Sequence, residues 1–448
     1  MIARVTRFFL VGVVSAALFT GRADAQLDVG VTEGRADPVP IAVTDFNGVG
    51  SLADLGADIA SVVKADLEFS GLFRAIPPGA FLQDPASLGE DAQPRFDLWR
   101  RSGAQALVTG WVSTESDGRI RVSFRLFDTL AEEGLVGFVF RGSEGIWRRI
   151  AHKVSDAVYH RFTGEGGYFD TRIVYVHEEG PQTALTKRIA VMDYDGENHR
   201  FLTSGDHTVL TPRFSPTIQK IAYFSYFNET TPRVNLLDLA TGRRDVLGDF
   251  PGMTFAPRFS PDGSSVIMSL AINGNTDIYV MNLETRTIKQ LTDGSYIETS
   301  PSYSPDGSRI AFTSDRTGQT QIYVMNADGS NQDRISWDLD NRASYSTPVW
   351  SPRGDLIAFT KHIPDSDWAI GVMSPEPGEG ERLLAFGDLV EGPTWSPNGR
   401  VIMFAHETYG FGEDTERVIK SIDLTGYVER TIRTQGAATD PAWSPLIP

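Results

Sequence analysis

The amino-acid sequence predicts a mixed α/β N-terminal domain followed by an all-β, six-bladed β-propeller that is closed by the C-terminal strand. Three observations support this fold class. A five-residue motif recurs six times in the second half of the 448-residue chain, the strand patterns at the two ends of that region are each incomplete, and the first third mixes helical and strand periodicity. The chain is long enough for two domains, each with its own core.

The first 25 residues have the composition of a cleaved secretory signal. Two arginines precede an apolar run over residues 8–19, and an Ala-Asp-Ala triplet that ends at Ala25 provides the small side chains that a signal peptidase requires. The run is too short to span a bilayer, which takes about 20 apolar residues. We therefore expect residues 1–25 to be removed, the mature chain to begin at Gln26, and no direct insertion into a membrane.

Composition narrows the class of protein further. The chain has no cysteine and a formal charge of −17, and removal of the signal, with three arginines and one aspartate, leaves the mature chain near −19. An acidic surface repels nucleic acids and anionic lipids, whose binding depends on lysine and arginine. No nucleic-acid partner is expected. A chain of this size buries enough apolar surface to be stable without disulfides, in the periplasm as well as outside the cell.

The mature chain up to residue 165 alternates between strand and helix patterns. A strand is expected over 40–46, and the apolar residues within 53–70 recur at the spacing of one helix face. The other expected elements are a short helix, a hairpin, a strand and a final amphipathic helix, over residues 96–102, 106–114 with 119–127, 135–140, and 143–162. These elements predict an α/β domain over 26–165 with a flexible mature N-terminus, and a glycine-rich linker before a propeller over 168–448.

The motif Pro-x-aromatic-Ser-Pro marks the six repeats. Its second proline falls at 216, 261, 305, 352, 397 and 445, so the intervals are 45, 44, 47, 45 and 48 residues. A period near 45 residues with strand-rich content is typical of a four-stranded propeller blade. A turn signal with glycine follows most copies, and three short strand patterns come after it.

The two ends of the repeat region indicate how the ring closes. The region begins with a second and a third strand, over 173–176 and 189–192, and ends with a first strand over 440–445. Six strands of each type result only if the last strand joins the opening blade. This pairing would leave no exposed sheet edge at the junction.

The motif aromatic occupies the same place in every blade. Such a ring of side chains can stack against sugars, but one aromatic residue at a fixed strand position is also what packing between blades requires, and we favour packing. The six residues are Phe214, Phe259, Tyr303, Trp350, Trp395 and Trp443.

The sequence lacks the usual signatures of an enzyme. It contains no Gly-x-Ser-x-Gly nucleophile elbow, no His-Glu-x-x-His zinc motif and no EF-hand calcium loop. The seven histidines lack the spacing of metal ligands, and His152 and His160 on the final helix are interpreted as surface or partly packed residues. We expect no catalytic residue, no metal site and no cofactor. The alternative is a periplasmic propeller hydrolase that acts on a sugar or a phosphate ester through charged residues in the central channel.

These features together resemble the TolB family, the periplasmic component of the Tol-Pal system. The resemblance rests on the signal, the α/β domain, the six motif copies, the terminal Pro-Ala-Trp-Ser-Pro at 441–445, and the segment 170–176 that opens the propeller. It implies a monomer in the periplasm that binds other proteins and supports outer-membrane integrity and constriction during cell division.

The resemblance also implies a partner site on the propeller. The family binds the lipoprotein Pal at one mouth of the channel, through loops that here include 250–257 and 294–301. Ala256 and Thr299 match positions that the family uses, whereas Met253 stands where a histidine is usual. The candidate residues at this mouth are His207, Met253, Thr254, Ala256, Glu298 and Thr299.

The second implied site is the mature N-terminus, which engages the inner-membrane protein TolA in the family. Its candidate residues are Gln26, Leu27, Asp28 and Val29. The segment 26–37 has few apolar residues and is also what a frayed terminus looks like. An extended segment of this kind can pair with a partner's sheet or fold back onto its own protein, and Pal binding could shift that exchange. The resemblance extends the partners to other outer-membrane proteins and to colicins that exploit the system for import.

Overall fold

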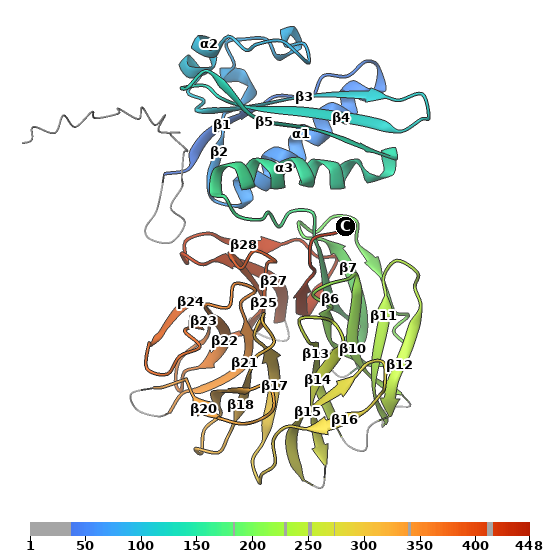
Figure 1. Cartoon of the computed structure of the whole chain (residues 1–448), viewed down its shortest axis with the longest axis vertical. Helices are drawn as coiled ribbons and strands as arrows, with labels where there is room; N and C mark the ends of the chain where they lie inside the picture. Colours follow the sequence, from blue (N-terminus) through green and yellow to red (C-terminus); the bar gives the residue numbers. More distant parts are fainter. Residues whose placement is uncertain are drawn as a thin grey trace, which may run out of the picture.

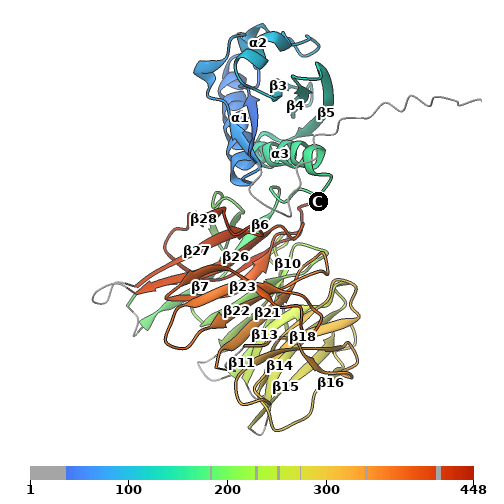
Figure 2. The same cartoon turned by 90° about the vertical axis from the view of Figure 1, so that its left-hand side faces the viewer.

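The computed structural model describes residues 37–448 except for 182–183, 228–230, 250–252, 273, 339–341 and 410–414. The expected signal and the candidate residues Gln26, Leu27, Asp28 and Val29 lie outside the described residues. In the described part of the chain, an α/β domain lies against a ring of six sheets (Figure 1), and a second view shows the same two layers from the side (Figure 2).

The N-terminal domain is built on one five-stranded sheet in the order β2-β1-β3-β4-β5. Strand β1 pairs in parallel with β2 and β3, and β4 and β5 continue the sheet in antiparallel fashion. The bounds are β1 Val39–Val43, α1 Ser51–Phe69, β2 Phe73–Ala75, 3₁₀ turns Pro78–Ala80 and Pro85–Ser87, α2 Phe96–Arg101, β3 Ala106–Thr114, β4 Ile120–Asp128, β5 Glu133–Gly142, 3₁₀ turn Glu144–Ile146, and α3 Trp147–Thr163.

The expected helices and strands of this domain are all present, with ends that shift by a few residues. The apolar stripe of α1 is buried, as its helical spacing predicts: Ile59, Val63 and Leu67 are fully enclosed. Helices α1 and α3 pack on one face of the sheet, and α3 lies nearest to the propeller (Figure 1). Strand β2 was not predicted, because three residues are too few to show a period.

Six four-stranded sheets form the propeller, which confirms the predicted fold class. From the innermost strand outward, the sheets are β29 Ala437–Trp443, β6 Arg172–Glu179, β7 Thr186–Asp193, β8 Arg200–Phe201; β9 Val209–Phe214, β10 Lys220–Phe227, β11 Thr231–Asp238, β12 Arg244–Asp249; β13 Met253–Phe259, β14 Ser265–Ile272, β15 Asn275–Asn282, β16 Ile288–Gln290; β17 Glu298–Tyr303, β18 Arg309–Ser314, β19 Gln321–Asn326, β20 Asp333–Arg334; β21 Ser344–Trp350, β22 Ile357–His362, β23 Trp368–Met373, β24 Glu381–Gly387; and β25 Leu389–Trp395, β26 Val401–Tyr409, β27 Thr415–Asp423, β28 Glu429–Ile432.

Each part of the repeated motif has a structural cause. Proline has no N–H to donate, and the ladder of every innermost strand shifts register at the first proline, as at a β-bulge. The motif serine closes the following turn, since Ser260 Oγ accepts a hydrogen bond from Ser265 N at 2.9 Å. The aromatic packs between blades: Trp395 is 6% exposed and donates from Nε1 to Val349 O at 2.9 Å. Phe259, Trp350 and Trp443 are likewise buried, as packing requires, whereas Phe214 and Tyr303 are half-buried, and all six aromatics also border the channel cavity.

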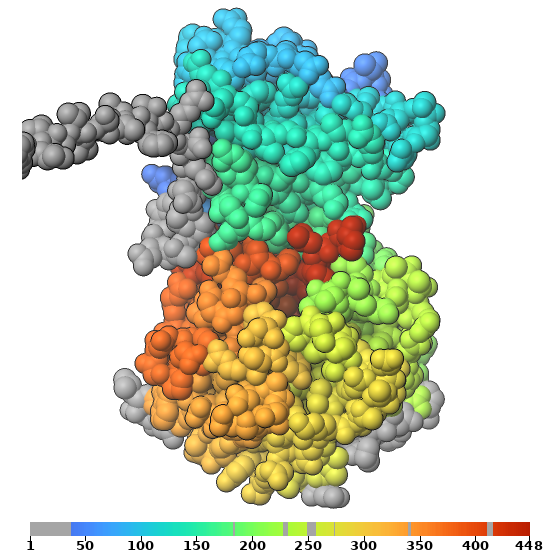
Figure 3. Space-filling view, viewed as in Figure 1, coloured from blue at the N-terminus to red at the C-terminus, as the bar shows by residue number. Residues whose placement is uncertain are grey.

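The C-terminal strand completes the opening blade. Strand β29 pairs antiparallel with β6, from Ala437 opposite Glu178 to Trp443 opposite Ile173. Trp443 is buried and its Nε1 donates to Thr171 Oγ1 at 2.8 Å. The predicted closure is confirmed. The last residues then reach the junction of the two domains (Figure 3), where Arg149 of α3 donates to the carbonyl oxygens of Ile447 and Pro448.

A buried polar cluster joins the two domains. Asp66 on α1 accepts a hydrogen bond from Tyr194 Oη at 2.6 Å and lies 2.8 Å from His152 Nδ1 on α3. Tyr194 and Asp195 belong to the turn after β7, so the cluster ties both helices to the closing blade. The interpretation of His152 as a surface or partly packed residue is wrong, because this side chain is 1% exposed. Its acidic partners, Asp66 and Asp195, explain its burial. They lie 86 and 43 residues away, so no pattern in the sequence around His152 indicates them.

Charge stabilises the buried imidazole. Burial alone would lower the pKa of His152, but the carboxylates of Asp66, Asp195 and Asp193 raise it to about 9. The ring is therefore a cation at neutral pH. Asp66, His152 and Asp195 present ligand atoms within 4.8 Å of one another, as a metal site would. However, Nδ1 already faces Asp66 and the guanidinium of Arg148 pairs with Asp195, so the three groups are arranged as an ion-pair cluster. Within it, Nε2 of His152 lies 3.9 Å from Asp195 and makes no hydrogen bond to a described residue.

We predict that closure by β29 stabilises the whole ring. Trp443→Ala should lower the free energy of unfolding by roughly 3–5 kcal/mol, because it empties a buried aromatic site. Trp337→Ala is a matched control, since Trp337 is 60% exposed, and it should change the free energy of unfolding little. Urea unfolding followed by circular dichroism measures both. Equal effects of the two substitutions would contradict the closure.

We also predict a pH-dependent contribution from His152. The folded-state pKa is raised to about 9 from 6.5, so the stabilisation is complete below pH 6.5 and is lost as the pH rises through about 9. His152→Ala should cost roughly 3–5 kcal/mol near neutral pH, because it leaves Asp66 buried without its cation. It should also flatten the pH dependence of unfolding over that range. His160→Ala, on the exposed side of the same helix, is the control, and an unchanged pH profile in His152→Ala would refute the assignment.

Candidate partner-binding surfaces

The direction of the innermost strands gives the propeller two different faces. Each of these strands ends in its Ser-Pro turn, and two such turns, through Arg353 and Arg400, pair with Glu165 at the end of the N-terminal domain. We call the face with these turns the proximal face. The loops that lead into the innermost strands therefore lie together on the opposite, distal face. A closed ring holds these loops in place, so a partner meets a surface that needs little ordering on binding.

The six candidate residues of the propeller mouth lie on three successive blades at this distal face. Met253, Thr254 and Ala256 lie in the first four positions of β13, whose backbone pairs with β14 from Met253 opposite Ala271. His207 is exposed in the loop before β9. Thr299, the second residue of β17, is half-buried with its hydroxyl 2.7 Å from that of Thr313.

Glu298 does not present its side chain at the surface. It is 2% exposed and pairs with Arg316, which belongs to the loop between β18 and β19. Its charge therefore holds two neighbouring loops together and is not offered to a partner. The sequence placed Glu298 in a distal loop but did not reveal its buried partner 18 residues further along the chain.

Three exposed apolar side chains on the distal face were not singled out from the sequence. Tyr296, Ile297 and Trp337 are 43%, 54% and 60% exposed. The guanidinium of Arg316 lies 5.7 Å from the ring centre of Tyr296, and that of Arg334 lies 4.4 Å from the ring of Trp337. Exposed aromatics with arginines beside them are typical of binding hot spots. The available signal was an aromatic residue in a loop that leads into an innermost strand.

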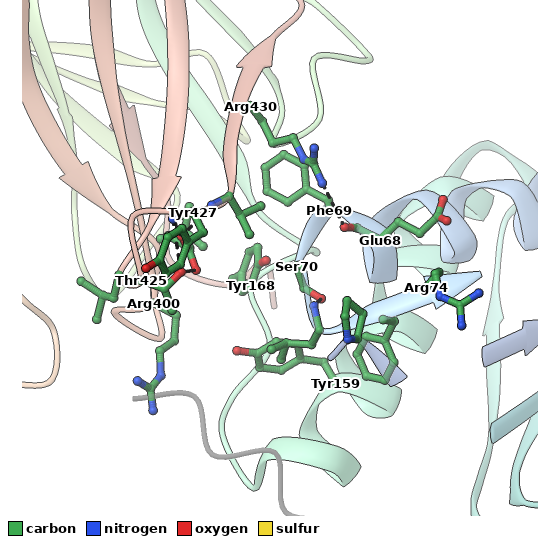
Figure 4. Close-up of a pocket in the computed structure, with 18 of the residues that line it drawn as sticks. Glu68, Phe69, Ser70, Arg74, Tyr159, Tyr168, Arg400, Thr425, Tyr427 and Arg430 are labelled. Carbon is green, nitrogen blue, oxygen red and sulfur yellow. Dashed lines mark hydrogen bonds between the residues drawn. The ribbon is translucent and has the colours of Figure 1, made fainter. Parts of the chain in front are cut away.

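A cleft separates the N-terminal domain from the last blade (Figure 4). Its volume is about 760 Å³, and the end of α1, strand β2, helix α3 and strands β26 to β28 border it. Basic and acidic side chains share its rim, since Arg74, Arg400 and Arg430 lie beside Glu68 and Asp423. The cleft can therefore hold a polar, extended segment of either charge.

The N-terminal segment enters the fold at this cleft. Pro38 is one of its lining residues, and the described chain begins one residue earlier, at Asp37. Strand β2, which also borders the cleft, is an edge strand of the sheet. An edge strand presents unpaired backbone groups to which an extended segment can add.

The central channel runs inside the ring and has a volume of about 350 Å³. The second residue of each motif copy lines it, and these six residues are Arg213, Arg258, Ser302, Val349, Thr394 and Ala442. None of the helices in the described part of the chain has the length and apolar character needed to cross a membrane.

Comparison with known proteins agrees with this architecture. Two family models match the chain, the TolB amino-terminal domain over residues 27–135 and the TolB beta propeller domain over residues 159–447. The chain is 54% identical to the Tol-Pal system protein TolB of Paramagnetospirillum magneticum over 444 residues, which cover 98% of this chain and 97% of that one. It is 44% identical to the protein of the same name from Gluconobacter oxydans over 426 residues, or 94% and 89% of the two chains.

A solved structure supports the same assignment. The crystal structure of TolB from Acinetobacter baumannii superposes with a TM-score of 0.77 and 29% identity, over 92% of this chain and 98% of that one. The superposition therefore spans nearly the whole of both chains. The chain belongs to the TolB family of Tol-Pal system proteins.

Proposed function

We propose that the protein is a periplasmic, non-enzymatic component of the Tol-Pal system that binds the lipoprotein Pal at its distal face and TolA through residues 26–37. In this role it supports outer-membrane integrity and constriction during cell division. The proposal is supported by the distal face, where the loops of a closed ring lie together and include Ala256 and Thr299, the two positions that the resemblance implies are used. The relatives are named Tol-Pal system protein TolB, which supports membership of that system.

The distal face has the chemistry of a protein-binding surface. Exposed Tyr296, Ile297 and Trp337 offer apolar area, and the arginines beside the two aromatics offer hydrogen-bond donors. Hot spots of protein interfaces favour aromatic and arginine side chains on a rigid support. Pal is the proposed ligand of this face, and other outer-membrane proteins and colicins would compete for the same surface.

The cleft is the proposed resting site of the N-terminal segment. Residues 26–37 number twelve, and an extended chain of that length spans at most about 40 Å, at about 3.3 Å per residue. The C-terminal end of the segment is joined to Pro38 on the cleft wall. From there the segment can lie along β2 or extend away from the protein. TolA would capture the extended form. A shift between the two forms gives Pal binding a route to the TolA site, by the linkage between two sites on one protein.

We predict that a charge at Thr299 weakens Pal binding and spares TolA binding. Thr299→Lys puts a long cation where the hydroxyl meets Thr313, at the distal end of β17. We expect the affinity for Pal to fall at least about tenfold, or about 1.4 kcal/mol. Titration calorimetry against both partners measures the effect. Thr241→Lys, on an exposed turn at the proximal ends of the strands, is the matched control and should bind Pal normally. Loss of both partners to the same degree would contradict separate sites.

Removal of residues 26–37 should abolish TolA binding and largely spare Pal binding, the reverse of the effect expected for Thr299→Lys. The α/β core and the ring should stay folded, because the described strands begin at Val39. Pal affinity should change only by a coupling energy of about 1–3 kcal/mol. Calorimetric titration with both partners and thermal unfolding of the truncated protein test this. If the truncated protein kept its TolA affinity, the assignment of this segment would be wrong.

A further inference from the structure

Two arginines lie side by side in the central channel without a carboxylate partner. Arg213 and Arg258 occupy the same motif position on β9 and β13, the innermost strands of neighbouring blades, and both line the channel. Arg213 is 6% exposed and donates from one guanidinium nitrogen to the carbonyl oxygen of Pro212, at 2.8 Å. The Nε of Arg258 is buried and has no hydrogen-bond partner among the described residues.

Three other partly or largely enclosed arginines of the propeller are neutralised by carboxylates. Arg417 lies between Glu407 at 3.0 Å and Glu178 at 3.4 Å. Arg316 pairs with Glu298, and Arg400 with Glu165. Within the described part of the chain, no ion pair of this kind is formed by Arg213 or Arg258. A guanidinium does not lose its proton in a protein, so the two charges remain.

The nearest carboxylates compensate the pair only in part. Asp440 is already engaged by the backbone N–H of Thr211, at 3.3 Å. The side chain of Glu391 is exposed, and it forms no ion pair with either arginine among the described residues. Burial lowers the pKa of Arg258, and the repulsion from Arg213 outweighs the attraction from Asp440. Burying like charges without counterions is costly, and a bound anion would relieve that cost.

The rest of the channel ring adds donors and apolar surface. Ser302 Oγ and Thr394 Oγ1 each accept a hydrogen bond from a backbone N–H of the next blade, at 3.1 Å. Their hydroxyl hydrogens remain able to donate, because those bonds use oxygen lone pairs. The other two positions are Val349 and Ala442. The two guanidiniums and the two hydroxyls supply donors for an anion, while the motif aromatics and the Ser-Pro turns border the same cavity.

We propose that the channel binds a small oxyanion, a phosphate or carboxylate group, between Arg213 and Arg258. The planar fork of each guanidinium matches the two oxygens of such a group, and the channel volume of about 350 Å³ accommodates it. The site requires neither of the proposed protein partners.

The test compares the purified protein in Tris chloride with and without inorganic phosphate, and separately with acetate, at constant ionic strength. We expect one saturable site by calorimetry and a rise of a few degrees in Tm. Arg258→Gln and Arg213→Gln should each weaken binding at least about tenfold and remove the rise in Tm. Arg243→Gln, which alters an arginine that is 75% exposed and paired with Asp245, should respond like the wild-type protein. The phosphate and acetate arms distinguish the two sources of the oxyanion.

Two further measurements separate loss of binding from loss of folding. Arg258→Met should keep or raise Tm in Tris chloride, because it removes an unbalanced charge, and should abolish the response to phosphate and acetate. Crystals soaked in selenate, an oxyanion that scatters anomalously, should show a peak between the two arginines. A wild-type protein without a saturable response, a normal response in Arg258→Gln, or a fall in Tm for Arg258→Met before any anion is added would each overturn the proposal.

Discussion

The pairing of β29 with β6 is the interaction on which the rest of the structure depends. It joins residues more than 250 positions apart, and so turns an open array of blades into a ring with no free sheet edge at the junction. The same segment continues to Ile447 and Pro448, whose carbonyl oxygens accept hydrogen bonds from Arg149 on α3. Ring closure and the seating of the N-terminal domain therefore share one short piece of chain.

The domain junction is both apolar and charged. Trp443 packs edge-on against Tyr168, and His152 lies as a cation among carboxylates that come from both domains. Removal of one partner from a buried ion pair is costly because it leaves the other charge unpaired, so the cluster also disfavours a shifted arrangement of the two domains. That property suits the cleft beside the junction. A cleft with fixed walls can bind an extended segment in one register, whereas loosely attached domains would not.

Features that are marked by residues close together in the sequence could be predicted, whereas features that depend on side-chain contacts between residues far apart in the sequence could not. The ring and its closure were predictable because proline, aromatic and serine recur once per blade, and each has a local structural cause. Strand β2 was missed because three residues show no period. His152 was misjudged because its acidic partners Asp66 and Asp195 lie 86 and 43 residues away, and Asp195 lies across the domain boundary. The distal face was predictable as a set of loops, but the exposure of Trp337 and the burial of Glu298 depend on side-chain packing that no local pattern encodes.

The repeat also separates the positions that build the ring from those that are free to act. Within Pro-x-aromatic-Ser-Pro, the proline bulge, the packed ring and the serine turn are needed in every blade, so the chain repeats them. The residue at the second position has no structural role that all six blades share, and it varies from arginine to alanine around the channel. The loops before the innermost strands vary in the same way. Specific chemistry in this protein is thus expected at positions that the motif leaves open, and two arginines at such positions in neighbouring blades are a departure that packing alone does not require.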